Sequence, residues 1–453
     1  MHTDHRGHTI TTTSKDAATK FSDAVERFVQ RQINVVSILQ ESIDADPHCA
    51  MSQATFGLML HGARNTGFKA SMQTTLEKAR ATASGSSRRE QHYVNALSCA
   101  CDGDLHATVD CFENILKQHP NDLLALTLAQ GELFWLGEMQ QSSRLSASVA
   151  KDWREDIPGY SEFLGLRAFD LEETGNYKDA EAAGRKAVSL RHTNVWGAHA
   201  VAHVLLMQRR HQEGLDWLTD KQSSWSQTNQ MKFHIWWHQC LFHLERNEYD
   251  ALLEHYDRWI RNRNDDLVIA MPDLYIDIQN GASMLWRLEH SGVDVGDRWQ
   301  EMAELAIHRL EDMSSPFTSA HYAVILAATG QHEQCDRLIE HMRAFAKNSK
   351  QTLSQRYTDA AIPAAEGAVA HRKGNYKKTL TIMLPARHHL WQMGGSHAQQ
   401  DLFHQIMVDA AVKLKQHDTA ALLLQEIEAI GFTEPARNVA YKAAGEFLCK
   451  RIQ

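Results

Sequence analysis

Proline is scarce in this chain, with only eight in 453 residues. Because proline cannot donate a backbone hydrogen bond inside a helix, this scarcity suits a chain that is helical nearly throughout. The sequence also lacks any run of about 18 or more apolar residues, which argues against a membrane-spanning helix. Its first residues, MHTDHRGHTITTTSKD, contain no apolar core, so we do not expect a secretory signal.

Cysteine is also scarce and scattered. Its seven residues are an odd number, and the closest pair, Cys99 and Cys101, does not form a CxxC motif. This favours reduced thiols in a cytoplasmic protein over a disulfide framework. Basic residues are outnumbered, giving a net charge of −9 and a pI near 6.3. We therefore expect neither nucleic acid nor an anionic membrane as the main partner.

The sequence does contain a recurring helix–turn–helix pattern. Residues 171–188, LEETGNYKDAEAAGRKAV, read as a helix end, a glycine turn and an alanine-centred second helix. Similar stretches recur along the chain, and their turns are marked by Gly103, Gly175, Asn247, Gly330 and Gly374. Small residues lie seven positions before such turns, at Ala96, Ala168, Ala202, Cys240, Ala323 and Gly367. Small residues let paired helices approach closely, as in tetratricopeptide repeats.

These patterns predict an all-α fold, an α-solenoid of about nine or ten tetratricopeptide-like helical hairpins. We place a divergent N-terminal helical cap at residues 1–90, the solenoid at 91–435 and a C-terminal capping helix at 436–453. The stretch ATASGSSRRE, residues 81–90, is rich in small polar residues and predicts a loop-like linker. Residues 292–299 and 390–397 indicate further breaks that fall inside repeats.

From residue 158 to about residue 412, over half of the chain, the sequence resembles the tetratricopeptide repeat protein 38 family. The resemblance is carried by VWGAHAVAHVLLMQRRHQEGLDWL, HIWWHQCLFHLERNEYDALLEHYD, LWRLEHSGVDVGDRW, HYAVILAATGQH and GGSHAQQDLF. It implies a tetratricopeptide-like solenoid and concentrates any function on the tract from His199 to Asp401. The first 150 residues match this family less clearly.

Histidine is abundant, with 27 residues. In two pairs, His199 with His203 and His234 with His238, the two members lie four residues apart. Residues four apart share one face of a helix. When the small residue before each turn is placed on the packing face, both pairs point to one side, together with aromatic and polar residues of neighbouring hairpins. We therefore predict one ligand pocket on the concave surface. Its predicted lining is Trp196, His199, His203, His234, Trp237, His238, Glu245, Trp286, Arg287, His321, His397 and Asp401.

Three interpretations of this lining stay open. The leading one is the binding of a small molecule or a peptide segment in the concave groove. The second is an enzyme that uses the same pocket for hydrolytic or proton-transfer chemistry, with or without a metal. The third is that the rings only fill space between hairpins.

Motif evidence for catalysis or for a bound group is thin. The sequence has no G-x-S-x-G elbow, no HExxH and no phosphate-binding loop, so no catalytic residue is assigned. We predict no metal ligand and no cofactor, and the sequence leaves homo-oligomerisation open.

Overall fold

The computed structural model describes residues 1–225, 227–249 and 251–450. The chain divides into two compact units. The first unit contains Met1–Phe134, Glu138–Val201 and the described residues of Ser223–Asn229. The second contains Trp135–Gly137, Ala202–Gln222 and the described residues of Gln230–Gln453. The predicted boundaries after residues 90 and 435 separate regular repeats from the caps, whereas the two units are compact parts of the chain. The predicted boundaries therefore remain predictions.

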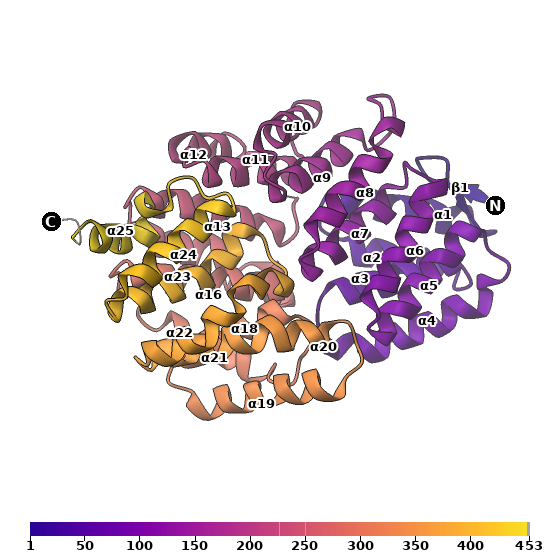
Figure 1. Cartoon of the computed structure of the whole chain (residues 1–453). Helices are drawn as coiled ribbons and strands as arrows, with labels where there is room; N and C mark the ends of the chain where they lie inside the picture. Colours follow the sequence, from indigo (N-terminus) through magenta and orange to yellow (C-terminus); the bar gives the residue numbers. More distant parts are fainter. Residues whose placement is uncertain (226, 250, 451–453) are drawn as a thin grey trace. The chain divides into compact units, whose positions relative to one another are not determined.

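The first unit consists mainly of helices and begins with a short antiparallel ribbon (Figure 1), in which His2 pairs with Ile10 and Thr3 with Thr9. Helices α7 (Leu123–Leu136) and α11 (Val195–Met207) begin in this unit, but their last residues belong to the second unit. In chain order its elements are β1 (His2–Thr3), β2 (Thr9–Ile10), α1 (Lys15–Val29), α2 (Val35–Ala45), α3 (Ala50–Gly62), η1 (Thr66–Phe68), α4 (Lys69–Ala83), α5 (Arg88–Asp102), α6 (Leu105–Gln118), α7 (Leu123–Leu136), α8 (Met139–Val149), η2 (Ala150–Asp152), α9 (Tyr160–Glu173), α10 (Tyr177–Leu190) and α11 (Val195–Met207).

The second unit continues the series of helices, with several short 3-10 or π turns between them. Its elements are α12 (His211–Thr219), η3 (Gln222–Trp225, most of which is counted with the first unit), α13 (Met231–Glu245), α14 (Leu252–His255), η4 (Tyr256–Ile260), α15 (Asp266–Ala270), α16 (Tyr275–His290), α17 (Arg298–Ile307), α18 (Pro316–Ala328), α19 (His332–Asn348), α20 (Leu353–Arg356), η5 (Tyr357–Ala361), α21 (Ile362–Arg372), α22 (Tyr376–Ala386), η6 (Arg387–Met393), α23 (His397–Lys413), α24 (His417–Ala429), η7 (Pro435–Arg437), η8 (Val439–Tyr441) and α25 (Lys442–Cys449).

Consecutive helices pack as hairpins, as Figure 1 shows for α9 with α10 and for α21 with α22. The residues that mark the predicted turns, Gly103, Gly175, Asn247, Gly330 and Gly374, all have positive φ. The predicted fold class, an all-α α-solenoid of tetratricopeptide-like helical hairpins, is confirmed. Strand structure in the described ranges is limited to the N-terminal ribbon and one isolated bridge. Among the described helices, none combines the length and the apolar character that crossing a bilayer would require.

The linker predicted at residues 81–90 is shorter than expected. Helix α4 continues to Ala83 and α5 begins at Arg88, so only residues 84–87 lie outside a helix. A capping box explains the early start of α5: the Glu90 carboxylate accepts the Ser87 backbone N–H at 2.8 Å, and the Ser87 hydroxyl accepts the Glu90 backbone N–H at 3.3 Å.

The other predicted breaks are confirmed in part. Residues 291–297 separate α16 from α17, whereas residues 390–393 of the second break belong to η6, so that only residues 394–396 lie between η6 and α23. Helix α25 falls within the predicted C-terminal capping helix at 436–453, of which residues 451–453 lie outside the described part of the chain.

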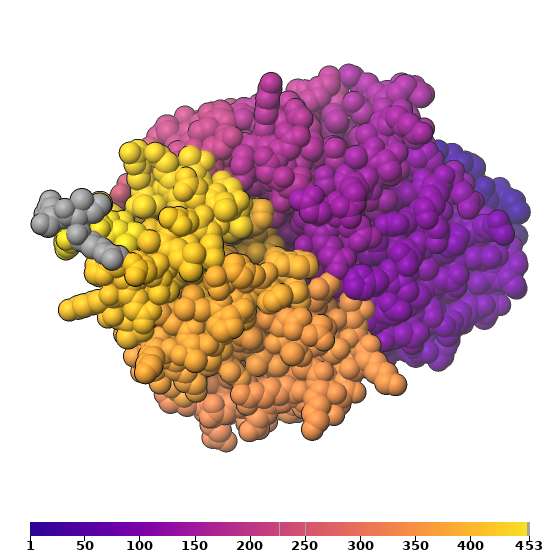
Figure 2. All heavy atoms as spheres, viewed as in Figure 1, coloured from indigo at the N-terminus to yellow at the C-terminus, as the bar shows by residue number. Residues whose placement is uncertain are grey.

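Within the second unit, the two helices of a hairpin differ in burial. Helices α13, α16, α18 and α23 are buried on most of their sides. Helices α17, α19 and α24 bury one stripe and expose the rest. On the face shown in Figure 2, side chains fill the spaces between neighbouring helices of this unit. Polar side chains on the first group of helices therefore lie inside the unit, and these helices carry most of the predicted site.

The small residues that precede the turns lie between paired helices. Ala96, Ala168, Ala202, Cys240 and Ala323 are fully buried. At Gly367 of α21, an added Cβ would lie 2.2 Å from the Cγ of Met383 on α22. The two helices are therefore in contact at this glycine, and even a methyl group would force Met383 to move.

We expect Gly367→Ala to lower the free energy of unfolding by about 1–3 kcal/mol, because overpacking displaces Met383 or separates the two helices. Urea unfolding followed by circular dichroism measures the change. Gly131→Ala is the matched control, since an added Cβ at Gly131 in the middle of α7 meets nothing within 4 Å. That variant should be unchanged or more stable by up to about 1 kcal/mol. Equal stability of Gly367→Ala and the wild type would contradict the close approach.

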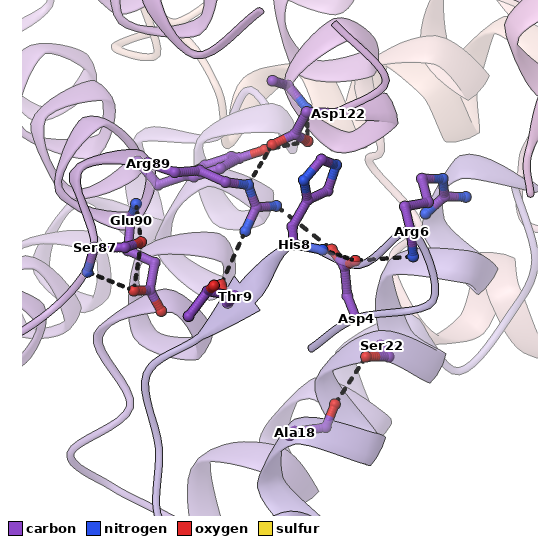
Figure 3. Close-up of polar contacts among 12 residues, drawn as sticks. Asp4, Arg6, His8, Thr9, Ala18, Ser22, Ser87, Arg89, Glu90 and Asp122 are labelled. Atoms are coloured by element: carbon purple, nitrogen blue, oxygen red, sulfur yellow. Dashed lines mark hydrogen bonds and ion pairs between the residues drawn. The ribbon is translucent and has the colours of Figure 1, made fainter. Parts of the chain in front are cut away.

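A buried ion network holds the N-terminal ribbon against α5 and α7 (Figure 3). The Arg89 Nε–H donates to the Asp122 carboxylate at 2.6 Å, and a second guanidinium nitrogen lies 3.6 Å from Asp4. A third donates to the Thr9 carbonyl oxygen at 3.4 Å. Asp122 also accepts the Tyr93 hydroxyl at 2.8 Å, and its side chain caps the start of α7. These buried groups thus anchor the ribbon to the first unit, with Ile10 buried and Thr3 exposed.

Candidate functional site

Three of the predicted histidines meet in the interior of the second unit. His203 comes from α11, and His234 and His238 come from α13. Each ring offers a nitrogen atom, and these atoms lie within 4.8 Å of one another. None of the three residues is more than 3% exposed. We call this group the imidazole cluster.

Hydrogen bonds fix how the imidazole cluster is arranged. The Nδ1 of His234 lies 2.8 Å from Oδ1 of Asn280 on α16. Since an amide oxygen only accepts, Nδ1 carries the proton and donates it, which leaves a lone pair on Nε2 of His234 in the neutral ring. The Nε2 of His238 lies 3.3 Å from that atom, and the rings of His203 and His238 have centroids 4.4 Å apart. The indole of Trp237 stacks on His234 at 5.2 Å.

Burial keeps the rings of His234 and His238 neutral. Loss of hydration lowers the pKa of His234 to about 3, in spite of the bond to Asn280, which raises it. Burial lowers the pKa of His238 well below its usual value, and the neighbouring imidazoles lower it further. Neutral imidazoles offer lone pairs as well as N–H donors, so the cluster can bind a hydrogen-bonding group or a metal ion.

A second group of predicted residues surrounds a small cavity in the same unit. The cavity has a volume of about 30 Å³, which is room for a single water molecule. Glu245 at the end of α13, Arg287 of α16 and Asp401 of α23 line it. The Arg287 guanidinium donates to the Ala398 carbonyl oxygen at 3.1 Å and lies 3.5 Å from Asp401. It also lies 5.8 Å from the ring of Trp237, which connects this group to the imidazole cluster.

Residues 432–441, which we call the C-terminal segment, cover this cavity. Phe432, Asn438, Ala440 and Tyr441 line it. The Tyr441 hydroxyl donates to Asp401, and the Val439 backbone N–H donates to the Glu245 carboxylate at 2.9 Å. Burial raises the pKa of Glu245 to about 7, although the Val439 bond opposes this shift.

Trp196 and His199 belong to the first unit, because the division between the units falls within α11. The Trp196 indole N–H donates to the Gln130 side-chain oxygen at 3.2 Å, and His199 stacks on Phe169 at 5.4 Å. His199 lies one turn before His203 on the same helix.

Trp286 lies in a third environment of the second unit. Its ring stacks on His290 at 4.8 Å and has its centroid 6.3 Å from that of His371. His371 in turn bonds Asp409 at 2.8 Å. Trp286 is therefore surrounded by a different set of histidines from those of the imidazole cluster.

His321 and His397 have separate environments. The His321 Nδ1–H donates to the Phe317 carbonyl oxygen at 2.8 Å, and its ring contacts those of Phe317 and Phe403. Burial lowers the pKa of His321 to about 4. His397 is half-buried and is the first residue of α23, next to the capping residue Ser396.

The structure thus brings together seven of the twelve predicted residues in two connected groups: His203, Trp237, His234, His238, Glu245, Arg287 and Asp401. Sequence reasoning missed Asn280 and Tyr441, whose side chains complete these groups. Three polar residues near the start of α16, Asp277, Gln279 and Asn280, were a signal for Asn280. Cys240 on α13 offers no nucleophile, because it is fully buried and burial raises its thiol pKa.

No family model matches the chain. Among solved structures, the chain is similar to the crystal structure of yeast Tom70. The TM-score is 0.34 and the sequence identity is 12%, and the match covers 97% of this chain and 90% of that chain.

Proposed function

We propose that this chain is a helical-repeat scaffold that binds a peptide segment on the second unit, at helices α13, α16 and α23 and the end of α11. Its kinship to the tetratricopeptide repeat protein 38 family and its cytoplasmic location are parts of this proposal. All seven cysteines are free thiols, as a reducing compartment would keep them.

The observation that carries the proposal is the way the C-terminal segment is held. Arg209, in the turn after α11, pairs with Glu434 at 3.0 Å and donates to the Arg437 carbonyl oxygen at 3.4 Å. The Met207 carbonyl oxygen accepts the Thr433 N–H at 3.0 Å. The surface therefore already binds the backbone of a segment whose only helical parts are the short 3-10 turns η7 and η8.

Side chains of the same surface add further recognition. Glu245 accepts a backbone N–H of the segment, and Asp401 accepts its tyrosine hydroxyl. A peptide in trans would meet the same donors and acceptors. A small molecule fits less well, because the cavity of about 30 Å³ is far below the roughly 300–1,000 Å³ of ordinary ligand pockets.

The test is competition between the C-terminal segment and a peptide in trans. We expect the full-length Val439→Pro variant to bind a labelled synthetic peptide, FTEPARNVAY, about tenfold more tightly than the wild type does. Proline removes the N–H that the Glu245 carboxyl accepts, and a typical hydrogen bond contributes about 0.5–1.5 kcal/mol, the upper end of which corresponds to about tenfold in affinity. Fluorescence anisotropy measures the affinity.

Two controls isolate the surface. Leu422→Ala alters an exposed residue of α24 and should leave peptide affinity unchanged. A peptide that carries proline in place of its valine should bind more weakly than FTEPARNVAY to the Val439→Pro variant. If neither the wild type nor the variant binds the peptide, the proposal of a peptide-binding surface is wrong.

A further inference from the structure

We propose that the imidazole cluster is a binding site for a transition-metal ion of the zinc class, with His203, His234 and His238 as its protein ligands. This site differs from the surface that holds the C-terminal segment, so it goes beyond the proposed function.

The spacing of the ring nitrogens suits a tetrahedral ion. The Nε2 atoms of His234 and His238 are 3.3 Å apart. Two nitrogens that each lie about 2.0–2.1 Å from a tetrahedral zinc ion are separated by about 3.3–3.4 Å. A nitrogen of His203 lies within 4.8 Å of both, so a small rotation of one ring would complete a set of three ligands.

The surroundings orient these ligands as metal sites require. Metal-binding histidines generally donate their second N–H to an oxygen atom, which fixes the tautomer and directs the other nitrogen at the ion. Asn280 supplies that oxygen for His234. The stacked indole of Trp237 limits rotation of the same ring. Both supporting residues are buried, at 1% and 0% exposure.

The donor set selects the class of ion. Three imidazole nitrogens suit zinc and neighbouring transition metals, whereas magnesium and calcium require oxygen ligands. From the sequence alone we predicted no metal, because the histidine pairs lack a recognisable motif. Only the fold brings His203 of α11 to the pair on α13.

The experiment measures the zinc content of the full-length protein without peptide. A protein without zinc would therefore contradict the metal site and leave the proposed peptide binding untouched. The protein is produced in zinc-supplemented medium, exchanged into buffer with a weak chelator and examined by elemental mass spectrometry. We expect one zinc per chain in the wild type and less than a tenth of that in His234→Gln and His238→Gln. We also expect Asn280→Ala to weaken zinc affinity by about 10- to 100-fold.

The matched control is His321→Gln, because His321 is an equally buried histidine of the same unit that lies outside the imidazole cluster. It should keep one zinc per chain. Circular dichroism verifies that each variant is folded. If the ligand variants do not fold, cobalt substitution of the wild type decides, since tetrahedral Co²⁺ gives intense visible bands and octahedral Co²⁺ gives weak ones. A wild type without zinc, weak cobalt bands, or full zinc content in both ligand variants would overturn the proposal.

Discussion

Replacing Arg89 with methionine is expected to lower the free energy of unfolding by about 3–5 kcal/mol, the usual cost of leaving one partner of a buried ion pair alone. Arg89 and Asp122 are 4% and 1% exposed. Burial alone would raise the pKa of Asp122, but the Arg89 guanidinium outweighs it and holds that pKa at about 2. Methionine fills a similar volume but leaves the Asp122 carboxylate charged and poorly hydrated (Figure 3).

The pH dependence of this effect follows from the lowered pKa of Asp122. An aspartate titrates near pH 4 in the unfolded chain and near pH 2 in the fold. The stability contributed by the Arg89 pair is therefore present above about pH 4 and is lost as the pH falls toward 2. Urea unfolding at several pH values measures this dependence.

Two controls bear on the Arg89 prediction. Asp122→Asn in the Arg89→Met background should restore part of the stability, because it removes the unpaired charge and keeps an oxygen for Tyr93. Arg154→Met breaks an exposed pair, with side chains 67% and 70% exposed, and should cost less than about 1 kcal/mol. A cost for Arg89→Met as small as that for Arg154→Met would contradict the prediction.

The fold was predictable because its signals are local. A glycine or asparagine with positive φ ends the first helix of a hairpin, and a small residue two turns earlier allows close packing, so both can be read within one repeat. The linker at 81–90 is shorter than its small polar composition indicates, because a capping box starts α5 within it. In that stretch Ser87 and Glu90 stand three residues apart, which is the spacing that begins a helix.

The site was only partly predictable. A helical wheel gives the direction of a side chain but not which neighbouring helix it meets. Trp286 and His321 are therefore buried, yet they meet His290 and Phe317 rather than the imidazole cluster. Tyr441 could not be predicted, since it reaches α23 only because the C-terminal segment folds back across the unit. Such long-range returns leave no local pattern in a sequence.

Replacing Asp277 with asparagine is expected to stabilise the protein at neutral and alkaline pH. Asp277 on α16 is fully buried, and no hydrogen bond to either carboxylate oxygen is present among the described residues. Burial raises its pKa to about 8, although Arg261 opposes this shift. The carboxyl is therefore mostly protonated at pH 7, and ionising it inside the fold costs free energy.

The raised pKa sets the sign of the effect. Below about pH 4, Asp277 is protonated in both the folded and the unfolded chain. As the pH rises toward 8, the unfolded chain releases the proton while the fold retains it, so the wild type loses stability throughout this range. Asparagine does not titrate. Its advantage over the wild type should grow from near zero at pH 4 to at most roughly 6 kcal/mol above pH 8, since the pKa rises by about four units and one unit corresponds to about 1.4 kcal/mol.

Urea unfolding at pH 4.5 and pH 8.5 measures the difference between Asp277→Asn and the wild type. Asp336→Asn is the matched control, because Asp336 is exposed on α19 and its replacement should alter stability little at either pH. A gain that is the same at both pH values would show that asparagine acts through packing rather than through the proton. A loss of stability at pH 8.5 would show that the folded protein stabilises the ionised carboxylate, and Arg261, the cation that most lowers the pKa of Asp277, would then be its partner.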